Sequence, residues 1–449
     1  VGAGPTGIAV ALTLARNNVP VRIIEKEFQH RRGQLGAAIQ PRTFEVFHFL
    51  RVPEIHERAT PFPPIQEHNR GPLEPSKTFS MVDYREPTLA IPYYNSKFMG
   101  QPTLEAITRE HLAELGCTVE LGTRLISFTQ DEKSVKAKVI KYSGNGGEEV
   151  EEDIEAAYLI GADGAKGVTR KQLGLSFLGT TREDDLMVLG DIHLETKGLD
   201  RDHWHFLSPM SRDVISFRPT DELGKDGWQF GMSSCTVDLK GLVHDEEALV
   251  NCIQDSVGLG DHVKVKEVMW VSDFRPNMRM VNKLGAGRIF VAGDAAHIHS
   301  PAGGQGMNSS VQDAFNIAWK IALVYKGLSP ASLLDTYTAE RLPVIAEMLG
   351  FTTKLHDRTF DSSYQMKSKL ERAMRRNGKM YMLGVNYRTS PIVVDEFVPT
   401  PTSGVAVVQS TYGDSQEGIL RAGDRAPDAP GLMPVVSPSR ASAGSTRMF

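Results

Sequence analysis

The glycine spacing of the first seven residues, VGAGPTG, restricts the fold of this chain more than any other feature of its sequence. Glycines stand at positions 2, 4 and 7, the spacing of a buried strand that turns tightly into a helix. In such a turn Gly2 allows the sharp bend, Gly4 lets a phosphate approach the backbone, and Gly7 lets the helix pack close to the strand. Pro5 suits the first helical turn, where Thr6 follows it. The N-terminal segment therefore predicts a unit of a Rossmann-like α/β fold.

The residues that follow complete this unit in register. Apolar side chains at helical spacing predict a helix over residues 8–15, and Val21–Ile24 predicts a buried strand. That strand ends at Glu25, 18 positions after the last glycine of the motif, close to the roughly 20 expected for a carboxylate that binds an adenosine ribose. A carboxylate favours a free 2′-hydroxyl over a 2′-phosphate. Glu25, with Lys26 beside it, therefore predicts an ADP-containing ligand, FAD or NAD.

A second strand, glycine-rich loop and helix lie between residues 288 and 327. An apolar strand ends at the corner Gly293-Asp294, and a loop from Pro301 leads to Asn308, a good N-cap for the helix that follows. The backbone amides of this loop would lie at a helix N-terminus, which favours negative charge, and Asp294 can accept hydrogen bonds from ligand hydroxyl groups. The same pattern fits an ordinary connection, and this stretch alone does not decide between the two.

Three further positions carry polar residues beside predicted strands or helices. The strand over residues 158–162 ends at Asp163-Gly164, which could bring a carboxylate and bare backbone near a phosphate or ribityl chain, although such a corner is usually only a turn. Arg42 stands at the start of a predicted helix, where it could cap the helix or clamp a diphosphate. Gln101 begins another predicted helix.

The middle and the end of the chain differ in pattern from these units. Residues 186–274 predict short strands separated by polar turns, and hence an inserted, mostly antiparallel sheet whose aromatic residues we interpret chiefly as core. Asn145-Gly146-Gly147 predicts a hairpin turn. Residues 51–77 are proline-rich and polar and predict a surface excursion. From Pro399 onward, the composition predicts a linker and a weakly ordered tail.

Composition excludes several classes of protein. The chain has 449 residues, enough for two or three domains, and its net charge of −5 gives no basic surface for nucleic acid. No apolar run reaches the roughly 18 residues of a membrane span. Cys117, Cys235 and Cys252 form neither a metal-binding nor a disulfide pattern, so we expect a cytoplasmic protein without a structural metal. Because residue 1 already stands within the strand–turn motif, we expect the natural N-terminus to lie further upstream.

Three separated motifs occur in one order along the chain: the glycine turn at residues 2–7, Asp163-Gly164 and Gly293-Asp294. In this combination the sequence resembles the FAD-dependent aromatic hydroxylases, the single-component flavoprotein monooxygenases typified by para-hydroxybenzoate hydroxylase and phenol hydroxylase. The resemblance extends to about residue 394. Gly167 departs from it, because the family often carries serine at that position.

The resemblance implies an α/β fold with a Rossmann-like FAD-binding domain, an inserted, mostly antiparallel substrate-binding sheet and C-terminal helices. We expect the FAD-binding domain to comprise residues 1–180 and 276–350, the substrate domain residues 181–275, and a helical segment residues 351–398. Residues 399–449 would be a linker or tail, or the start of a truncated thioredoxin-like domain as in the phenol hydroxylase branch.

The resemblance also assigns roles to individual residues. Glu25 would bind the adenosine ribose, Asp294 the ribityl chain, and Asp163 both FAD and the incoming nicotinamide nucleotide. Arg42 and Gln101 would reach the diphosphate and ribityl region. The implied cofactor-binding residues are Gly2, Gly4, Pro5, Thr6, Gly7, Glu25, Lys26, Arg42, Gln101, Asp163, Gly164, Gly293, Asp294, Gly304, Gly306, Met307 and Asn308.

The implied reaction consumes NADPH or NADH and O2. Oxygen would form a flavin C4a-hydroperoxide that must be kept from water, and its outer oxygen would attack an electron-rich ring such as a phenol, with loss of CO2 if a hydroxybenzoate reacts at its carboxyl-bearing carbon. The substrate proton would pass to a base, for which Tyr93, Tyr94 and His297 are equal candidates. The remaining implied catalytic residues are Pro301, Gly303 and Gly304 beside the flavin, and Arg218 for a substrate carboxylate. Arg218 fits a surface arginine equally well.

Two other functions are compatible with the same pattern. A flavin oxidase or dehydrogenase would need no external NAD(P)H, and a non-catalytic protein could keep the FAD fold to bind a partner. A flavin halogenase is disfavoured because the sequence contains no WxWxIP segment. The expected partners are a small aromatic substrate, O2 and NAD(P)H, and a homodimer is the oligomer left open.

Overall fold

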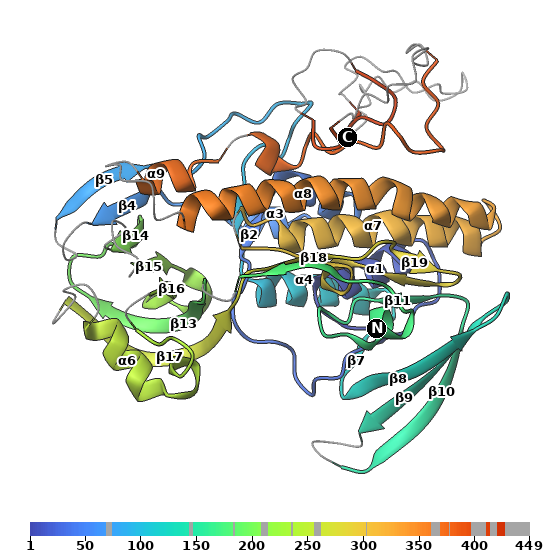
Figure 1. Ribbon diagram of the computed structural model, residues 1–449, viewed down its shortest axis with the longest axis horizontal. Helices are drawn as coiled ribbons and strands as arrows, with labels where there is room; N and C mark the ends of the chain where they lie inside the picture. Colours follow the sequence, from blue (N-terminus) through green and yellow to red (C-terminus); the bar gives the residue numbers. More distant parts are fainter. Residues whose placement is uncertain are drawn as a thin grey trace, which may run out of the picture.

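A computed structural model describes residues 1–68, 74–142, 147–182, 185–207, 214–234, 237–255, 262–301, 303–360, 369–376, 378–396, 410–413 and 420–426. Figure 1 shows two main bodies side by side: a sheet with α6 at the left, and a helix-covered body around α1, α4 and α7 at the right. In the described part of the chain, no helix has both the length and the apolar character that crossing a bilayer demands.

The centre of the right-hand body is a short sheet that is parallel except where β19 meets β20. Its two strand pairs, β1–β7 and β11–β20, are joined by the first two residues, because the Gly2 amide donates to Ile24 and the Ala162 amide donates to Val1. The order across the sheet is β7 (Val119–Glu120), β1 (Ile23–Ile24), Val1-Gly2, β11 (Leu159–Gly161), β20 (Ile289–Val291) and β19 (Gly285–Ala286). The three predicted motifs therefore follow three neighbouring strands.

Helices bury the apolar faces of this sheet. α1 (Pro5–Arg16) begins at the predicted Pro5 and packs against α7 (Gly306–Tyr325) and α4 (Gln101–Glu114). α8 (Thr336–Phe360) runs along α7 on the outer side (Figure 1). The shorter helices are α2 (Pro41–Phe49), α3 (Glu54–Arg58) and α5 (Val168–Gln172). The predicted helices at residues 8–15, after Pro41, from Gln101 and before Gly327 are all confirmed.

The left-hand body is a seven-stranded sheet, antiparallel except where β14 meets β4. The predicted inserted sheet supplies five of its strands, and α6 (Glu246–Asp255) packs on one face. The order is β17 (Val263–Phe274), β13 (Met187–Thr196), β16 (Gly227–Ser233), β15 (Val214–Pro219), β14 (Trp204–Leu207), β4 (Ile65–His68) and β5 (Pro75–Phe79). The predicted surface excursion at residues 51–77 is therefore wrong in part, because four- and five-residue strands among prolines leave no measurable alternation.

Smaller sheets complete the structure. The antiparallel strands β8 (Thr123–Gln130), β9 (Val135–Tyr142) and β10 (Glu149–Ala156) project from the lower right of Figure 1. The β9–β10 pair agrees with the predicted hairpin, whose Asn145 and Gly146 lie outside the described residues. The remaining strands are β2 (Ala38–Ile39), β3 (Thr60–Pro61) and β6 (Lys97–Phe98) in one sheet, and β12 (Leu178–Thr181), β18 (Asn277–Met280) and β21 (His297–Ile298) in another.

The C-terminal part only partly follows the prediction. α9 (Lys369–Met374) and a 3-10 turn at Gly378–Tyr381 are helical, but residues 382–396 run without a helix. The predicted linker is wrong for residues 410–413 and 420–426, which pack onto the FAD-binding domain. Tyr412, for example, is only 3% exposed.

Candidate functional site

The three predicted corners lie at one edge of the parallel sheet. Gly2 has a φ of +92°, and a Cβ on it would overlap the carbonyl oxygen of Ala162, the residue before the Asp163 corner. A Cβ on Gly7 would overlap the carbonyl oxygen of Gly2, so α1 sits as close to its strand as the motif predicts. A Cβ on Gly293 would overlap the Thr6 hydroxyl. The structure thus brings the first turn, the Asp163 corner and the Asp294 corner together.

Gly4 is the glycine of the turn that faces open space. A Cβ on it would meet nothing within 4 Å, and it is the N-cap of α1 without a capping side chain. The Glu25 carboxylate lies beside this turn, because it accepts the Ala3 amide at 2.8 Å and the Glu27 amide at 3.2 Å. An open helix N-terminus beside a fixed carboxylate suits a diphosphate linked to a ribose. Lys26 points elsewhere and pairs with Glu27 at 3.5 Å.

Asp163 keeps one carboxylate oxygen unused. Its Oδ2 accepts the amide and the hydroxyl of Thr169 at 2.9 and 3.0 Å, whereas its buried Oδ1 has no hydrogen-bond partner among the described residues. Gly164, with a φ of +75°, turns the chain away. A Cβ on Gly167 would overlap the Asp163 carboxylate, so glycine at this departure from the family pattern lets the acid adopt its position. The free oxygen can accept a ligand hydroxyl.

Asp294 is exposed to solvent but has many protein atoms around it. The surrounding protein desolvates the carboxylate and raises its pKa, while the charges of His297 and Arg31 act in the opposite direction. This combination places Asp294 on the wall of a recess. Gln101, predicted for the same region, begins α4 and donates to Glu105 at 3.0 Å.

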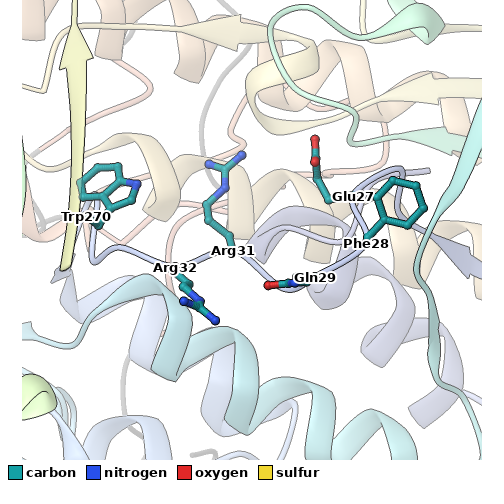
Figure 2. A pocket seen from close by; sticks show the side chains of 6 residues that line it. All are labelled: Glu27, Phe28, Gln29, Arg31, Arg32 and Trp270. Atoms are coloured by element: carbon teal, nitrogen blue, oxygen red, sulfur yellow. The ribbon is translucent and has the colours of Figure 1, made fainter. Parts of the chain in front are cut away.

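A cavity of about 420 Å³ lies between the FAD-binding domain and the sheet (Figure 2). Its lining is cationic and aromatic and consists of Glu27, Phe28, Gln29, Arg31, Arg32 and Trp270. Gly33, with a φ of +93°, lies flat against the Trp270 ring, so β17 closes one end of the cavity. Arg31 acts electrostatically on both Glu105 and Asp294, which places its charge near the recess.

Arg31 and Arg32 are candidates for the diphosphate that the sequence analysis missed. Arg42, the predicted clamp, instead donates to Glu45 at 2.6 Å, and Arg425 also pairs with Glu45 at 2.5 Å. The prediction that Arg42 reaches the diphosphate is therefore not supported by its contacts. A basic pair shortly after Glu25 was the available signal, because a clamp needs positive charge within reach of the turn.

The loop before α7 is tied to β2 by one amide side chain. Asn308 accepts the Gln40 amide at 2.8 Å and donates to the carbonyls of Ala38 and Gly304 at 2.9 and 2.7 Å. The predicted N-cap role of Asn308 is wrong, because α7 begins at Gly306 with Gln305 as its N-cap. As first-turn residues, Gly306 and Met307 have amides without intrahelical acceptors, and these can face an anionic edge of a ligand.

The glycines of this loop are required by its conformation. Gly303 and Gly304 have φ values of +90° and +58°, and the Gly304 amide donates to the Pro301 carbonyl at 3.1 Å. A Cβ on Gly303 would overlap the end of the Met380 side chain. Pro301 itself is exposed. The loop is therefore a fixed turn with one open side.

The two candidate tyrosines have different surroundings. The Tyr93 hydroxyl lies 2.9 Å from His48 Nδ1, and burial raises the pKa of Tyr93. The Tyr94 hydroxyl accepts from Arg85 at 2.9 Å, and the same guanidinium lies 5.6 Å from the ring centre of Tyr381. Tyr381 follows Met380, the residue packed against the glycine loop. Tyr94 is thus linked to that loop, whereas Tyr93 packs on α2.

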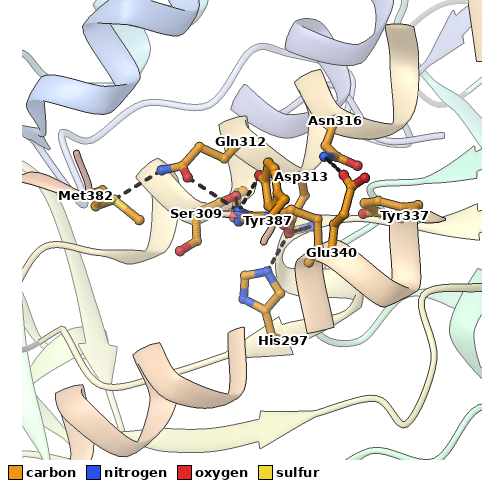
Figure 3. Close-up of polar contacts among 12 residues, drawn as sticks. His297, Ser309, Gln312, Asp313, Asn316, Tyr337, Glu340, Met382 and Tyr387 are labelled. Atoms are coloured by element: carbon orange, nitrogen blue, oxygen red, sulfur yellow. Dashed lines mark hydrogen bonds and ion pairs between the residues drawn. The ribbon is translucent and has the colours of Figure 1, made fainter. Parts of the chain in front are cut away.

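His297 belongs to a buried ionic network (Figure 3). Its Nε2 lies 2.6 Å from Asp313, and Arg341 donates to the same carboxylate at 2.7 Å, with all three side chains inaccessible to solvent. Burial alone would raise the pKa of Asp313, but the charges of Arg341 and His297 outweigh it and lower the pKa. Asp313 also accepts the Gly293 amide at 3.3 Å. Through this hydrogen bond to Gly293, the network holds the backbone next to Asp294.

Arg218 is buried at the seam between the sheet and the FAD-binding domain, so its interpretation as a surface arginine is wrong. It is 4% exposed, donates to Gln229 at 2.7 Å and to Gln34 at 3.3 Å, and lies 4.3 Å above the Phe98 ring. Burial lowers its pKa to about 10. Gln34 in turn donates to the buried Asp191. Within the described residues, the acceptors of this guanidinium are the neutral amide oxygens of Gln34 and Gln229, while the charges of Glu222 and Asp191 act on it from further away.

Comparison with known proteins gives the same picture. The family model described as "FAD binding domain" matches residues 1–352. The chain is 34% identical over 431 residues to a flavin-dependent monooxygenase of Mycobacteroides abscessus, covering 95% of this chain and 82% of that protein. It is 30% identical over 363 residues to pentachlorophenol 4-monooxygenase of Sphingobium chlorophenolicum, covering 80% of this chain and 64% of the relative.

The structural match supports the fold. The ternary complex of aklavinone-11 hydroxylase with FAD and aklavinone superimposes with a TM-score of 0.75 and 25% identity, covering 96% of this chain and 78% of the other. The predicted FAD-binding α/β fold with an additional substrate sheet is confirmed. The chain therefore belongs to the FAD-binding domain family, within the single-component flavoprotein monooxygenases of the aromatic hydroxylase type.

Proposed function

We propose that this chain hydroxylates a phenolic aromatic substrate, using NADPH or NADH as the reductant and O2 as the oxygen source. The observation that carries the proposal is the meeting of the three corners at one edge of the parallel sheet, next to the fixed glycine loop. Proteins related to this chain are named for pentachlorophenol, or bound to aklavinone, which supports an aromatic substrate.

FAD fits the polar groups at this edge. The open N-terminus of α1 at Gly4 suits the diphosphate, for which Arg31 is a further candidate partner, and Glu25 suits the ribose. The unused oxygen of Asp163 and the exposed carboxylate of Asp294 suit the hydroxyl groups of the ribityl chain. The described protein atoms leave open space at Gly4 and no partner at the Asp163 oxygen, and Asp294 is open to solvent.

Bound FAD would supply the redox chemistry, taking electrons from the nicotinamide and delivering one oxygen atom of O2 to the substrate. The chain's contribution is positioning and charge. The N-terminus of α7 favours negative charge near Gly306 and Met307 by about 0.3–1 kcal/mol per contact, and up to about 2 kcal/mol when the contact is partly buried. Asn308 and the two left-handed glycines hold those amides in place.

Among the three base candidates, the contacts favour Tyr94. Its oxygen accepts a hydrogen bond from Arg85, a donor that stabilises negative charge on a phenol oxygen. We assign His297 to positioning, because its Nε2 is taken by Asp313 and its side chain is inaccessible. Tyr93 stays a prediction. Arg218 is the candidate for an anionic substituent of the substrate, since its hydrogen-bond acceptors carry no charge.

The test is a screen of phenols and hydroxybenzoates with the FAD-loaded enzyme. We expect a substrate to accelerate NADPH or NADH oxidation and to gain the mass of one oxygen atom, or of one oxygen atom less CO2. Conversion of a substrate without any nicotinamide nucleotide would instead indicate an oxidase or dehydrogenase. Binding of FAD with no turnover of any ring would favour a non-catalytic role.

A further inference from the structure

Residues 410–413 and 420–426, which we call the C-terminal arm, lie beyond residue 352, where the match to the FAD-binding domain ends. Figure 1 places this region on the outer side of α7 and α8. No role in the site follows from the family match for these residues. Their contacts nevertheless lead directly to the glycine loop.

One carboxylate anchors the first half of the arm. Glu347 of α8 accepts the Ser410 hydroxyl at 2.5 Å, the Thr411 amide at 2.7 Å and the Tyr412 amide at 3.2 Å. Burial would raise the pKa of Glu347, but these hydrogen bonds outweigh it and lower the pKa. Tyr412 also forms a β-bridge with Val385. Backbone and side chain of Tyr412 are therefore fixed.

From this anchor the Tyr412 side chain reaches Gln305. Burial raises the pKa of the Tyr412 phenol, so the hydroxyl stays protonated and donates to Gln305 Oε1 at 3.3 Å. The other end of the Gln305 amide donates to the carbonyls of Gly303 and Met380 at 2.9 and 3.1 Å. Gln305 is inaccessible to solvent and is the N-cap residue of α7.

The second half of the arm contacts α2, the loop at Ala90 and the segment at Arg388. Arg425 pairs with Glu45 of α2 and donates to the Ala90 carbonyl at 2.6 Å. Asp424 binds Arg388 through both of its oxygens, at 2.5 and 3.0 Å. The arm thus joins α8, the glycine loop and α2.

We propose that the C-terminal arm is part of the frame of the active site, and that Tyr412 is a positioning residue that sets the glycine loop through Gln305. The Gly303 and Met380 carbonyls can only accept, so the Gln305 oxygen faces Tyr412, whose hydroxyl donates to it and holds that end of the amide. The nitrogen is then directed to the Gly303 and Met380 carbonyls, which orients the peptide groups that lead into α7. The proposal shares the FAD site with the proposed function, but it does not depend on which substrate is oxidised.

A double-mutant cycle on the FAD-loaded enzyme tests the proposal. Tyr412→Phe removes one oxygen and keeps the ring, and Gln305→Leu removes the side-chain amide through which Tyr412 acts on the loop. We expect Tyr412→Phe to raise the Kd for FAD roughly 3- to 10-fold, to shift the visible absorption of bound FAD, and to lower the share of NADPH oxidation that yields product. Because Tyr412 acts through Gln305, the double variant should be no worse than Gln305→Leu alone. Tyr325→Phe, at an exposed tyrosine at the end of α7, is the matched control and should change none of these.

Glu347→Gln supplies a second variant that touches neither the loop nor the phenol. It should loosen the arm and move FAD affinity and absorption in the same direction as Tyr412→Phe. Unchanged FAD affinity and absorption in Tyr412→Phe, or effects of Tyr412→Phe and Gln305→Leu that simply add, would overturn the proposal. Both readouts concern bound FAD alone, so a failure here is distinguishable from the absence of hydroxylation in the wild-type enzyme.

Discussion

Gly4 and Gly7 belong to one motif, but we expect Gly7→Ala to lower the stability of the apoprotein and Gly4→Ala to weaken FAD binding. Gly7 lies against the carbonyl oxygen of Gly2, a backbone atom that cannot rotate away, so Gly7→Ala must push α1 from its strand. Overpacking of this kind costs about 1–3 kcal/mol of stability. Gly4 has ordinary backbone angles, φ −74° and ψ −175°, and empty space at its Cβ position, so Gly4→Ala should change apoprotein stability by no more than about 0.5 kcal/mol.

In the FAD-binding assay, we expect Gly4→Ala to be strongly impaired although its apoprotein is stable. If the diphosphate approaches Gly4, the added methyl group takes that space and displaces at least one charge-assisted hydrogen bond, worth about 1.5–3 kcal/mol. The Kd for FAD should then rise roughly 10- to 150-fold in Gly4→Ala. The measurements are thermal unfolding of the apoprotein and titration of its fluorescence with FAD. A Gly4→Ala protein that binds FAD within threefold of wild type, or a Gly7→Ala apoprotein as stable as wild type, would refute the reasoning.

Four further outcomes follow from buried or bonded groups. Glu25→Gln should raise the Kd for FAD by about tenfold, because a neutral amide is a weaker acceptor for ribose hydroxyls than a carboxylate; an unchanged titration would remove Glu25 from the site. Arg341→Met leaves the buried Asp313 with His297 as its remaining ion-pair partner in the described part of the chain. The free energy of unfolding should therefore fall by about 3–5 kcal/mol in denaturant titrations, and a loss below about 1 kcal/mol would contradict the network. Asn308→Asp turns two donated bonds into contacts between a carboxylate and the carbonyls of Ala38 and Gly304, and should lower FAD affinity more than Asn308→Ala does. Burial lowers the pKa of the inaccessible His68 from 6.5 to about 4, so the unfolded chain takes up the proton at higher pH than the folded protein does. The free energy of unfolding should therefore fall by up to about 3 kcal/mol as the pH drops from 6.5 to 4. Denaturant titrations at pH 4.5 and 7 should show a smaller fall in His68→Gln, and an equal fall in the variant and the wild type would contradict this assignment.

The parts of the site that the sequence predicted are those that local chain geometry determines. A strand that turns into a helix within three residues needs Gly2 and Gly7, and an acid at the end of the next strand must lie beside that turn, so Glu25 was within reach of sequence reasoning. The same holds for the corners at Asp163 and Asp294, which follow neighbouring strands of one parallel sheet.

The parts that the sequence did not predict depend on partners far along the chain. Arg42 is drawn to Glu45, which also binds Arg425, 380 positions away from Glu45. Asn308 lies three residues after Gln305, the N-cap of α7, and its side-chain amide is hydrogen-bonded to Ala38 and Gln40 in the β2 region. Strand β4 is four residues long, and only its pairing with β14 and β5 distinguishes it from a loop. A local sequence pattern cannot predict these contacts, because they join residues that are far apart along the chain.

The place of β4 and β5 in the left-hand sheet has a practical consequence for protein engineering. The last two strands at one end of this sheet come from residues 65–79, more than a hundred positions before the rest. A chimera that exchanges only residues 181–275 with a relative would join five foreign strands to two native ones. Transferring the whole sheet between relatives therefore requires both segments to be grafted together.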